Sequence, residues 1–295
     1  MSYRFSKGAG LSEQVRRVAI EEIESAIDEI TRREPDVYEA VHEARKHFKK
    51  TRSLIRLVRD SSPRYFRTQN HVLRDLGRNL SSTRDAQAML ECWESLRLRY
   101  RRAFGKGRLD RFRHQLIDHR DEIAANETAL NETIEKVVST LQDARDRVED
   151  WSFEREDFGL IQGGFTRCYR RGRQSMKSAV QAKSGEAFHS WRKRVKDHWY
   201  HIRLLEEAWP GPMQARNQEM ATLSDLLGDY HDLVVFEEWL AGPRGSDALR
   251  RELTAIVARR RATLSVKSFD LGGRIYAELS RAFATRIRNG WESEG

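Results

Sequence analysis

The cations between residues 42 and 56 have the spacing that points most directly to chemistry. They recur every three or four residues, so an α-helix would bring them onto one face about 120° wide. Only one acid, Glu43, lies within residues 42–59. An ordinary solvated helix face mixes both signs, because like charges three or four residues apart repel by a few tenths of a kcal/mol per pair. We therefore expect this face to bind a polyanion, which would relieve the repulsion; its members are His42, Arg45, Lys46, Lys49, Arg52 and Arg56.

The same face returns 147 residues further along the chain. Residues 39–85 align with 186–232 without a gap, and 14 of the 47 positions are identical, against roughly three expected by chance. This match predicts an internal duplication. Trp199 stands where the first copy has Arg52, so the second face is one cation short. The second copy contributes His189, Arg192, Lys193, Lys196 and Arg203 to the predicted binding site.

A third group of cations precedes the second copy. Residues 164–183 contain no acid, and charge segregated in this way is typical of a focused binding surface. The spacing predicts that Arg167, Arg171 and Lys177 share one helix face. The candidates from this segment are Arg167, Arg170, Arg171, Arg173 and Lys177.

The elements that must position these cations are helices. The five prolines all fall between segments with apolar residues at three- and four-residue spacing, and no alternating run predicts a strand. The sequence therefore predicts an all-α protein of one large domain, with a first helical repeat over about 1–150 and a second over about 158–295. The helices are expected at roughly 11–33, 36–60, 64–83, 85–103, 108–124, 127–149, 160–183, 186–209, 213–228, 232–241, 246–265 and 270–288.

Two paired motifs resemble the CHAD family, the conserved histidine α-helical domain. They are His42-x2-Arg45-Lys46-x2-Lys49-x2-Arg52 and the copy running from Phe188 to Lys196, preceded by Tyr169-Arg170-Arg171-Gly172-Arg173. The resemblance implies two pseudo-symmetric four-helix bundles around a basic central surface or channel. It also implies binding of inorganic polyphosphate, which can place a protein at polyphosphate granules. The Glu-x-Glu-x-Lys motif of the catalytic domain fused to some members is missing, since Glu154-Arg155-Glu156 lacks the lysine.

Two other functions stay open. A nucleic-acid-binding protein would use the same charge, but exposed aromatic residues would be expected beside it, and Tyr200 is the only good candidate on the cationic face. A phosphohydrolase could use a histidine–aspartate pair such as His231-Asp232, although Arg84-Asp85 in the first copy keeps only the acid. We expect binding without turnover. His42 and His189 could each donate a hydrogen bond to phosphate or bond across a bundle interface.

Several classes of protein are disfavoured by the composition. Cys92 and Cys168 are the only cysteines, too few for a disulfide framework or a four-cysteine zinc site. His42 and His47 are five residues apart, whereas a shared metal needs a spacing of four on a helix. We therefore expect no metal and no cofactor. A net charge of +9, no long apolar run and no signal-like N-terminus predict a cytoplasmic protein without a membrane segment.

Overall fold

The computed structural model consists of helices and their connections, without a strand, over the residues it describes, which are 3–34, 36–100, 106–124, 127–241 and 247–293. Residues 101–103 of the helix expected over 85–103, residue 246, and the outer ends of the two expected repeats lie outside these ranges. The helices are α1 Leu11–Arg32, α2 Val37–Leu57, α3 Pro63–Asn79, α4 Ser81–Arg99, α5 Lys106–Ala124, α6 Glu127–Glu149, α7 Gly159–Ala182, α8 Gly185–Leu204, α9 Pro210–Ala241, α10 Asp247–Ile275 and α11 Ser280–Glu292, with a 3-10 turn at Glu206–Ala208.

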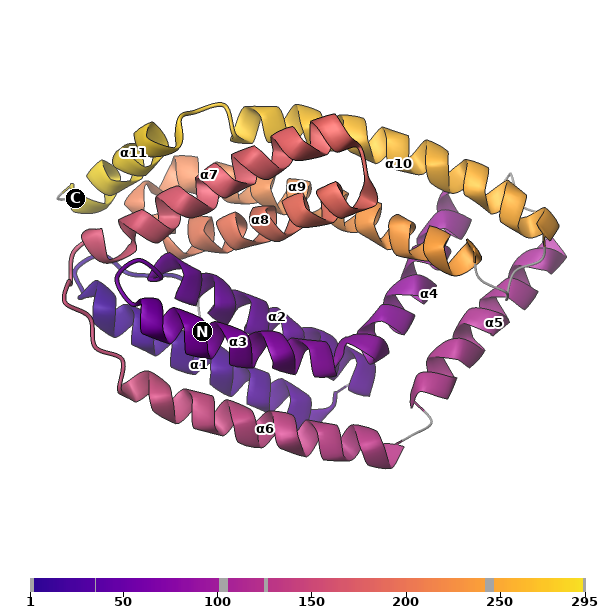
Figure 1. Cartoon of the computed structure of the whole chain (residues 1–295), viewed down its shortest axis with the longest axis horizontal. Helices are drawn as coiled ribbons and strands as arrows, with labels where there is room; N and C mark the ends of the chain where they lie inside the picture. The colour runs from indigo at the N-terminus through magenta and orange to yellow at the C-terminus, as the bar shows by residue number, and fades with distance from the viewer. Residues whose placement is uncertain (1–2, 35, 101–105, 125–126, 242–246, 294–295) are drawn as a thin grey trace.

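Two layers of helices make up the molecule (Figure 1). The first bundle is α1, α2, α3 and α6, and in the second α7, α8, α9 and α10 pack together with α11 against α7. Helix α4 leaves the first bundle and reaches α9, while α5 packs along α4. The prediction of an all-α fold with two bundles is confirmed.

The helix bounds agree with the repeat inferred from the sequence. Adding 147 to the ends of α2 gives 184 and 204, and α8 runs from Gly185 to Leu204. Likewise α1 falls onto α7, and Pro63 at the start of α3 falls onto Pro210 at the start of α9. The duplication itself remains an inference from these correspondences.

Two expected helix breaks are wrong. Residues 213–228 and 232–241 belong to one continuous helix of 32 residues, α9. Gly228 lies inside it and is buried, and a Cβ atom there would lie 3.7 Å from the Arg192 guanidinium. The break expected near 266–269 instead falls after Ile275, because α10 continues past the half-buried Phe269 that packs against the core.

Apolar residues from both layers form one core. The large side chains at its centre include Trp93, Phe165, Trp191 and Phe283, each with at most 1% of its surface exposed. Burial of aromatic rings of this size supplies much of the stabilising hydrophobic effect in a domain. None of the described helices combines the length and hydropathy that a membrane-spanning segment needs.

Candidate functional site

Helices α2 and α8 hold the two cationic faces because each has an apolar face opposite. Phe48 and Ile55 of α2 are buried, as are Trp191 and Ile202 of α8. Both helices also begin at a capped residue. The Asp36 carboxylate accepts from the amide of Tyr38 at 2.8 Å, and the Ser184 hydroxyl accepts from the amide of Ala187 at 3.2 Å. Such caps fix where a helix starts, and therefore which way its cations point.

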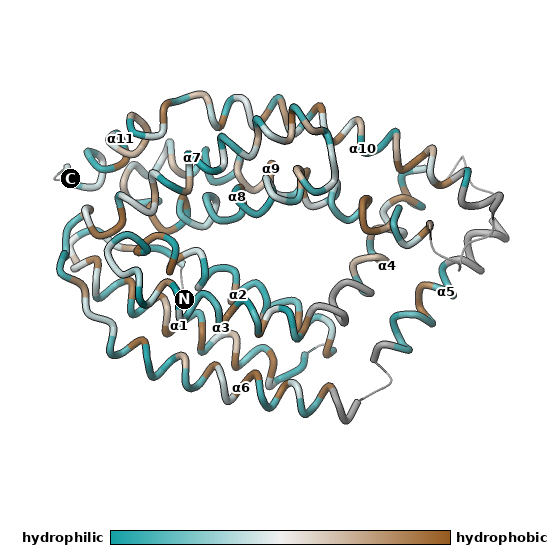
Figure 2. Tube along the Cα trace, viewed as in Figure 1, coloured by the Kyte–Doolittle hydropathy of each residue, from teal (hydrophilic) through white to brown (hydrophobic). Residues whose placement is uncertain are grey.

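Direct contacts between α2 and α8 fix the two faces relative to each other. The Ser53 hydroxyl donates to the Asp197 carbonyl at 2.9 Å, and Nε2 of His201 lies 2.8 Å from the Ser53 carbonyl. Gly164 of α7 adds a close backbone contact, since a Cβ atom there would lie 2.0 Å from the carbonyl oxygen of Leu57. The two bundles thus meet through α2, α7 and α8, and Figure 2 shows α2 and α8 to be largely hydrophilic along the middle of the molecule.

Cations of the two halves come close enough to perturb one another. Burial lowers the pKa of Lys193, with Arg194, Arg52, Arg192 and Arg78 adding to the effect. The pKa of Lys196 is lowered to about 8 by burial and then by Arg192, with Lys46 of the other half contributing. Burial together with Arg56 also lowers the pKa of Arg52 to about 10. We call Lys46, Arg52, Arg78, Lys193 and Lys196 the central cationic cluster.

Several cations of the α2 face, two of them members of this cluster, are bound to the protein itself. Arg56 pairs with Asp197 at 3.1 Å and donates to Asn70 at 3.1 Å. Arg52 donates to the same Asn70 oxygen at 3.2 Å, and Arg45 donates to the carbonyl of Gly77. Lys46 pairs with Glu43 at 2.6 Å. Arg56 and Arg45 therefore stabilise the packing of α2. Within the cluster, Asn70 positions Arg52 and Glu43 positions Lys46.

The two duplicated histidines have different surroundings. The His189 ring packs on His231 of α9, with ring centroids 4.2 Å apart. Burial, with Lys193 and Arg192, lowers the pKa of His189 to about 4, and burial lowers that of His231 to about 4. His189 is therefore neutral at pH 7 and has a structural contact. His42 is one-third exposed and lies 3.9 Å from Glu43.

The α7 cations divide between two places. Arg171 is near the α2–α8 junction, since burial and then Arg194 and Arg59 lower its pKa, and Arg167 pairs with Asp60 at 2.9 Å. Lys177, expected to share their face, instead lines a separate pocket of about 420 Å³ together with Arg170, Arg173 and Arg281. The structure thus brings Arg171 toward the central region and groups Arg170, Arg173 and Lys177 elsewhere.

Tyr200 is not on the accessible cationic face. Only 3% of its surface is exposed, because Tyr3 of the N-terminal segment packs edge-on against it, with ring centroids 5.9 Å apart. Burial raises the pKa of its hydroxyl to about 12. The neighbouring Trp199 stacks on Tyr200, and the Lys196 ammonium lies 4.5 Å from the centre of the Trp199 ring. The Tyr200 ring is therefore closed to a base, and the half-buried Trp199 ring already contacts Tyr200 and Lys196.

Comparison of the two copies did not identify two cations that the structure places in the region where α2 and α8 meet. Arg78 of α3 acts on Lys193, and Arg194 of α8 pairs with Asp197 at 3.2 Å. Arg78 has no identical partner in the second copy, because Asp225 occupies that position. Asp225 is near Lys196 and raises its pKa, so the repeat places opposite charges at this equivalent position.

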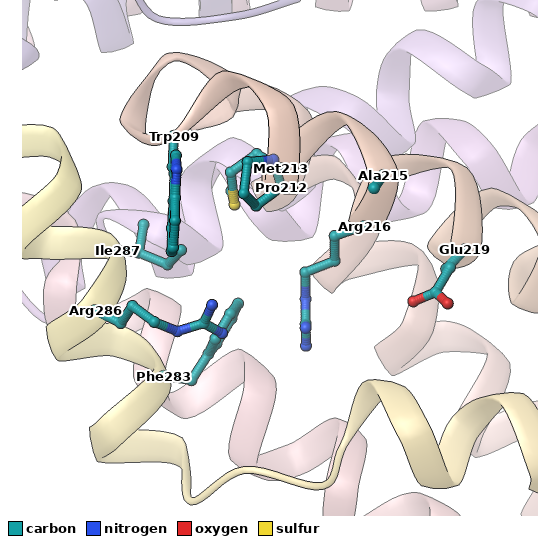
Figure 3. Close-up of a pocket in the computed structure, with 9 residues that line it drawn as sticks. All are labelled: Trp209, Pro212, Met213, Ala215, Arg216, Glu219, Phe283, Arg286 and Ile287. Carbon is teal, nitrogen blue, oxygen red and sulfur yellow. The ribbon is translucent and has the colours of Figure 1, made fainter.

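A further pocket lies away from the cluster, between the start of α9 and α11 (Figure 3). Its volume is about 320 Å³, and Trp209, Met213 and Ile287 contribute its apolar wall. The guanidinium groups of Arg216 and Arg286 lie 4.1 and 5.3 Å from the centre of the Phe283 ring. Arg216 also donates to the Ile275 carbonyl at 2.6 Å. Both arginines therefore contact other parts of the protein.

Comparisons with known proteins agree with the architecture. The family model of the CHAD domain matches residues 17–241, more than half of the chain. Among solved structures, the chain is similar to the crystal structure of the CHAD domain from the plant Ricinus communis, with a TM-score of 0.59 and 16% sequence identity over 94% of each chain. At this identity the likeness concerns the fold. No curated protein matches the chain.

Proposed function

The chain belongs to the CHAD domain family, and we propose that its central cationic cluster binds inorganic polyphosphate. Polyphosphate carries a negative charge on every unit and presents phosphate oxygens alone. Arg can donate two hydrogen bonds to such oxygens, and Lys supplies a compact charge. The proposal therefore needs only closely placed cations that a polyanion can reach.

The observation that carries the proposal is the mutual effect of cations from the two bundles. Lys193 of α8 has its pKa lowered by Arg52 of α2 and Arg78 of α3, beyond the effect of burial and Arg194. Bringing like charges together costs free energy that a free surface would avoid by separating them. A bound polyanion offsets that cost and raises these pKa values.

Polyphosphate fits this surface better than nucleic acid. Proteins that bind single strands usually stack bases on aromatic side chains. Here Tyr200 is buried, and Trp199 is covered by Tyr200 and Lys196. In a competition experiment, single-stranded RNA at equal phosphate concentration should fail to displace polyphosphate.

We infer binding without hydrolysis. Phosphoryl transfer needs charged groups aligned on the leaving and attacking oxygens. Here Glu43 is paired with Lys46, and Asp197 is engaged by both Arg56 and Arg194. A protein that holds polyphosphate in this way would gather at polyphosphate granules in the cytoplasm. Tight binding accompanied by steady release of phosphate would replace this inference with an enzymatic one.

The direct test is calorimetric titration with long-chain polyphosphate at several salt concentrations. If about six phosphates are neutralised, log K against log salt should have a slope of roughly −4, by the single-strand coefficient. Lys193→Glu with Lys196→Glu should abolish binding. Lys136→Glu with Arg147→Glu is the matched control, because it changes the net charge equally and both residues are exposed on α6 at the outer edge of the first bundle. Equal binding by the double variant and the control would remove the cluster from the site.

A further inference from the structure

Three side chains that could hold a metal ion meet where α7 packs on α8. They are Cys168 of α7 and His198 and His201 of α8, and all three are buried. One ligand atom from each lies within 4.8 Å of the other two. The histidines are three residues apart and so project from neighbouring turns of one helix face. Within the described chain this is the one group of three His, Cys, Asp or Glu residues placed closely enough for an ion.

The histidines offer ring nitrogens that the fold leaves without partners. His198 is fully buried, and neither of its ring nitrogens has a hydrogen-bond partner. His201 is fully buried too, and its Nδ1 has no partner. Buried polar atoms are nearly always satisfied in folded proteins, so three orphaned nitrogens beside a cysteine need an explanation.

The one hydrogen bond in the group orients His201 as a ligand. Its Nε2 lies 2.8 Å from the Ser53 carbonyl, and a carbonyl accepts but cannot donate. Nε2 therefore carries the proton, which leaves the lone pair on Nδ1. Metal-bound histidines commonly donate the other ring N–H to a backbone carbonyl in this way, which fixes both tautomer and ring direction.

We propose that Cys168, His198 and His201 form a buried site for a soft metal ion, with Cu⁺ a better match than Zn²⁺. Thiolate and imidazole are the ligands that these ions select. On binding, the Cys168 S–H bond breaks, its proton leaves to solvent, and a sulfur–metal bond forms with no change of oxidation state. The site does not depend on polyphosphate binding.

Charge favours Cu⁺. One thiolate and two neutral imidazoles give a neutral complex with Cu⁺, which three ligands can satisfy. Zn²⁺ would leave one buried positive charge and would need a fourth ligand. The charged side chains nearby do not decide between the two ions, because Asp197 acts on the Cys168 thiol with the opposite sign to Arg56 and Arg194 and forms ion pairs with both. The hydroxyl of Tyr276, buried and without a partner, is the candidate fourth donor for Zn²⁺.

The site is a property of the second half alone. The equivalent positions in the first copy are Glu21, Thr51 and Leu54, so the duplicated cationic faces do not require these three residues. Aromatic rings surround His198, with ring centroids at 5.6 Å for Phe165 and 5.3 Å for Tyr169. The competing explanation is accordingly a histidine that packs as one more ring of an aromatic core.

Anaerobic titration with Cu⁺ against a chromophoric chelator tests the proposal. Because the site is buried, the full chain is also refolded from denaturant in the presence of Cu⁺. About one Cu⁺ should bind per chain, and Cys168→Ser should lose it. Cys92→Ser should keep it, because Cys92 lies on α4, away from the histidines.

A second variant separates metal binding from packing. His198→Phe suits the aromatic surroundings, so it should stay folded by circular dichroism and still lose Cu⁺. Binding of Zn²⁺ is tested with Co²⁺ as a spectroscopic probe. A sulfur-to-cobalt absorption band in the wild type that is absent in Cys168→Ser would report a thiolate ligand. Binding of Zn²⁺ and Co²⁺ without Cu⁺ would support the site and overturn the preference. If folded wild-type protein binds none of these ions through Cys168, the aromatic-core explanation stands and the proposal is overturned.

Discussion

The indole N–H of Trp199 donates a hydrogen bond of 2.7 Å to the side-chain oxygen of Asn217. This bond repeats, 147 residues later, the bond of 3.2 Å from Arg52 to Asn70. The second half thus has an aromatic ring where the first has a cation, yet both side chains donate to the equivalent asparagine. The equivalence ties the two halves together more closely than helix bounds alone, because it matches side-chain geometry at two positions.

Restoring the cation should strengthen binding of polyphosphate. In Trp199→Arg the new guanidinium can donate to Asn217 as Arg52 does to Asn70, and it adds one charge beside Lys196. We expect tighter binding and a salt slope steeper by about 0.7, at some cost in stability from the lost stack on Tyr200. Trp199→Phe is the neutral control and should bind as wild type. Calorimetry that finds the same slope for Trp199→Arg as for wild type would place residue 199 outside the path of the polyanion.

Periodicity in the sequence predicted most of the helices, apart from the two breaks that fall inside α9 and α10, and it predicted which face of α2 and α8 is buried. Trp191 is fully buried, as its position opposite the cations predicts. Tyr200 shows the limit of this reasoning. A helical wheel puts it with the cations, but the N-terminal segment crosses α8, with the Phe5 amide donating to the Leu204 carbonyl at 2.9 Å. Tyr3 then covers Tyr200, and no local pattern contains that contact.

Comparison of the two copies was equally selective. Selecting the positions that are identical in both copies identified Lys193 and Lys196. It did not identify Arg78, because its counterpart Asp225 has the opposite charge. The group of Cys168, His198 and His201 was missed for a different reason. Cys168 is 30 residues from His198 in the sequence, and only the packing of α7 on α8 brings the thiol to the rings.

Asp197 should matter more for stability than an exposed acid with a similar partner. Its carboxylate is only 12% exposed and pairs with Arg56 and Arg194. Asp197→Asn leaves two partly buried guanidinium groups without their counter-charge, and we expect a loss of about 3 kcal/mol. Asp60 pairs with Arg167 at a position where both side chains are more than a third exposed, so Asp60→Asn should cost less than about 1 kcal/mol. Urea denaturation of both variants makes the comparison, and equal losses would contradict it.

The affinity for polyphosphate should fall as the pH rises through about 8. Lys196 has a pKa of about 8 in the free protein because of burial and Arg192, so it loses its charge above that pH. A bound polyanion raises this pKa toward its ordinary value, so that binding above pH 8 requires uptake of a proton. Linkage then predicts a loss of up to about tenfold in affinity per pH unit until the pKa of the bound state is reached.

Lys196→Arg separates this effect from titration elsewhere, because a guanidinium keeps its charge over the same range. Titrations of both proteins at pH 7, 8 and 9 should diverge, with the wild type weakening and the variant changing little. Parallel decline of the two would assign the pH dependence to a different group.

The contact between α7 and the end of α2 should control both stability and binding. At Gly164 a Cβ atom would lie 2.0 Å from the carbonyl oxygen of Leu57 and 2.6 Å from that of Arg56. Both obstacles are backbone atoms, so Gly164→Ala must push α7 away from α2, at a cost of about 3 kcal/mol or more. Gly273 of α10 is the matched control. No atom lies within 4 Å of a Cβ atom there, so Gly273→Ala should gain about 0.5–1 kcal/mol from helix propensity. Because α7 packs on both α2 and α8, such a displacement should change how the two cationic faces meet, and Gly164→Ala should also weaken polyphosphate binding at temperatures where circular dichroism reports a folded chain. Unchanged affinity in a measurably destabilised variant would mean that each bundle binds the polyanion on its own.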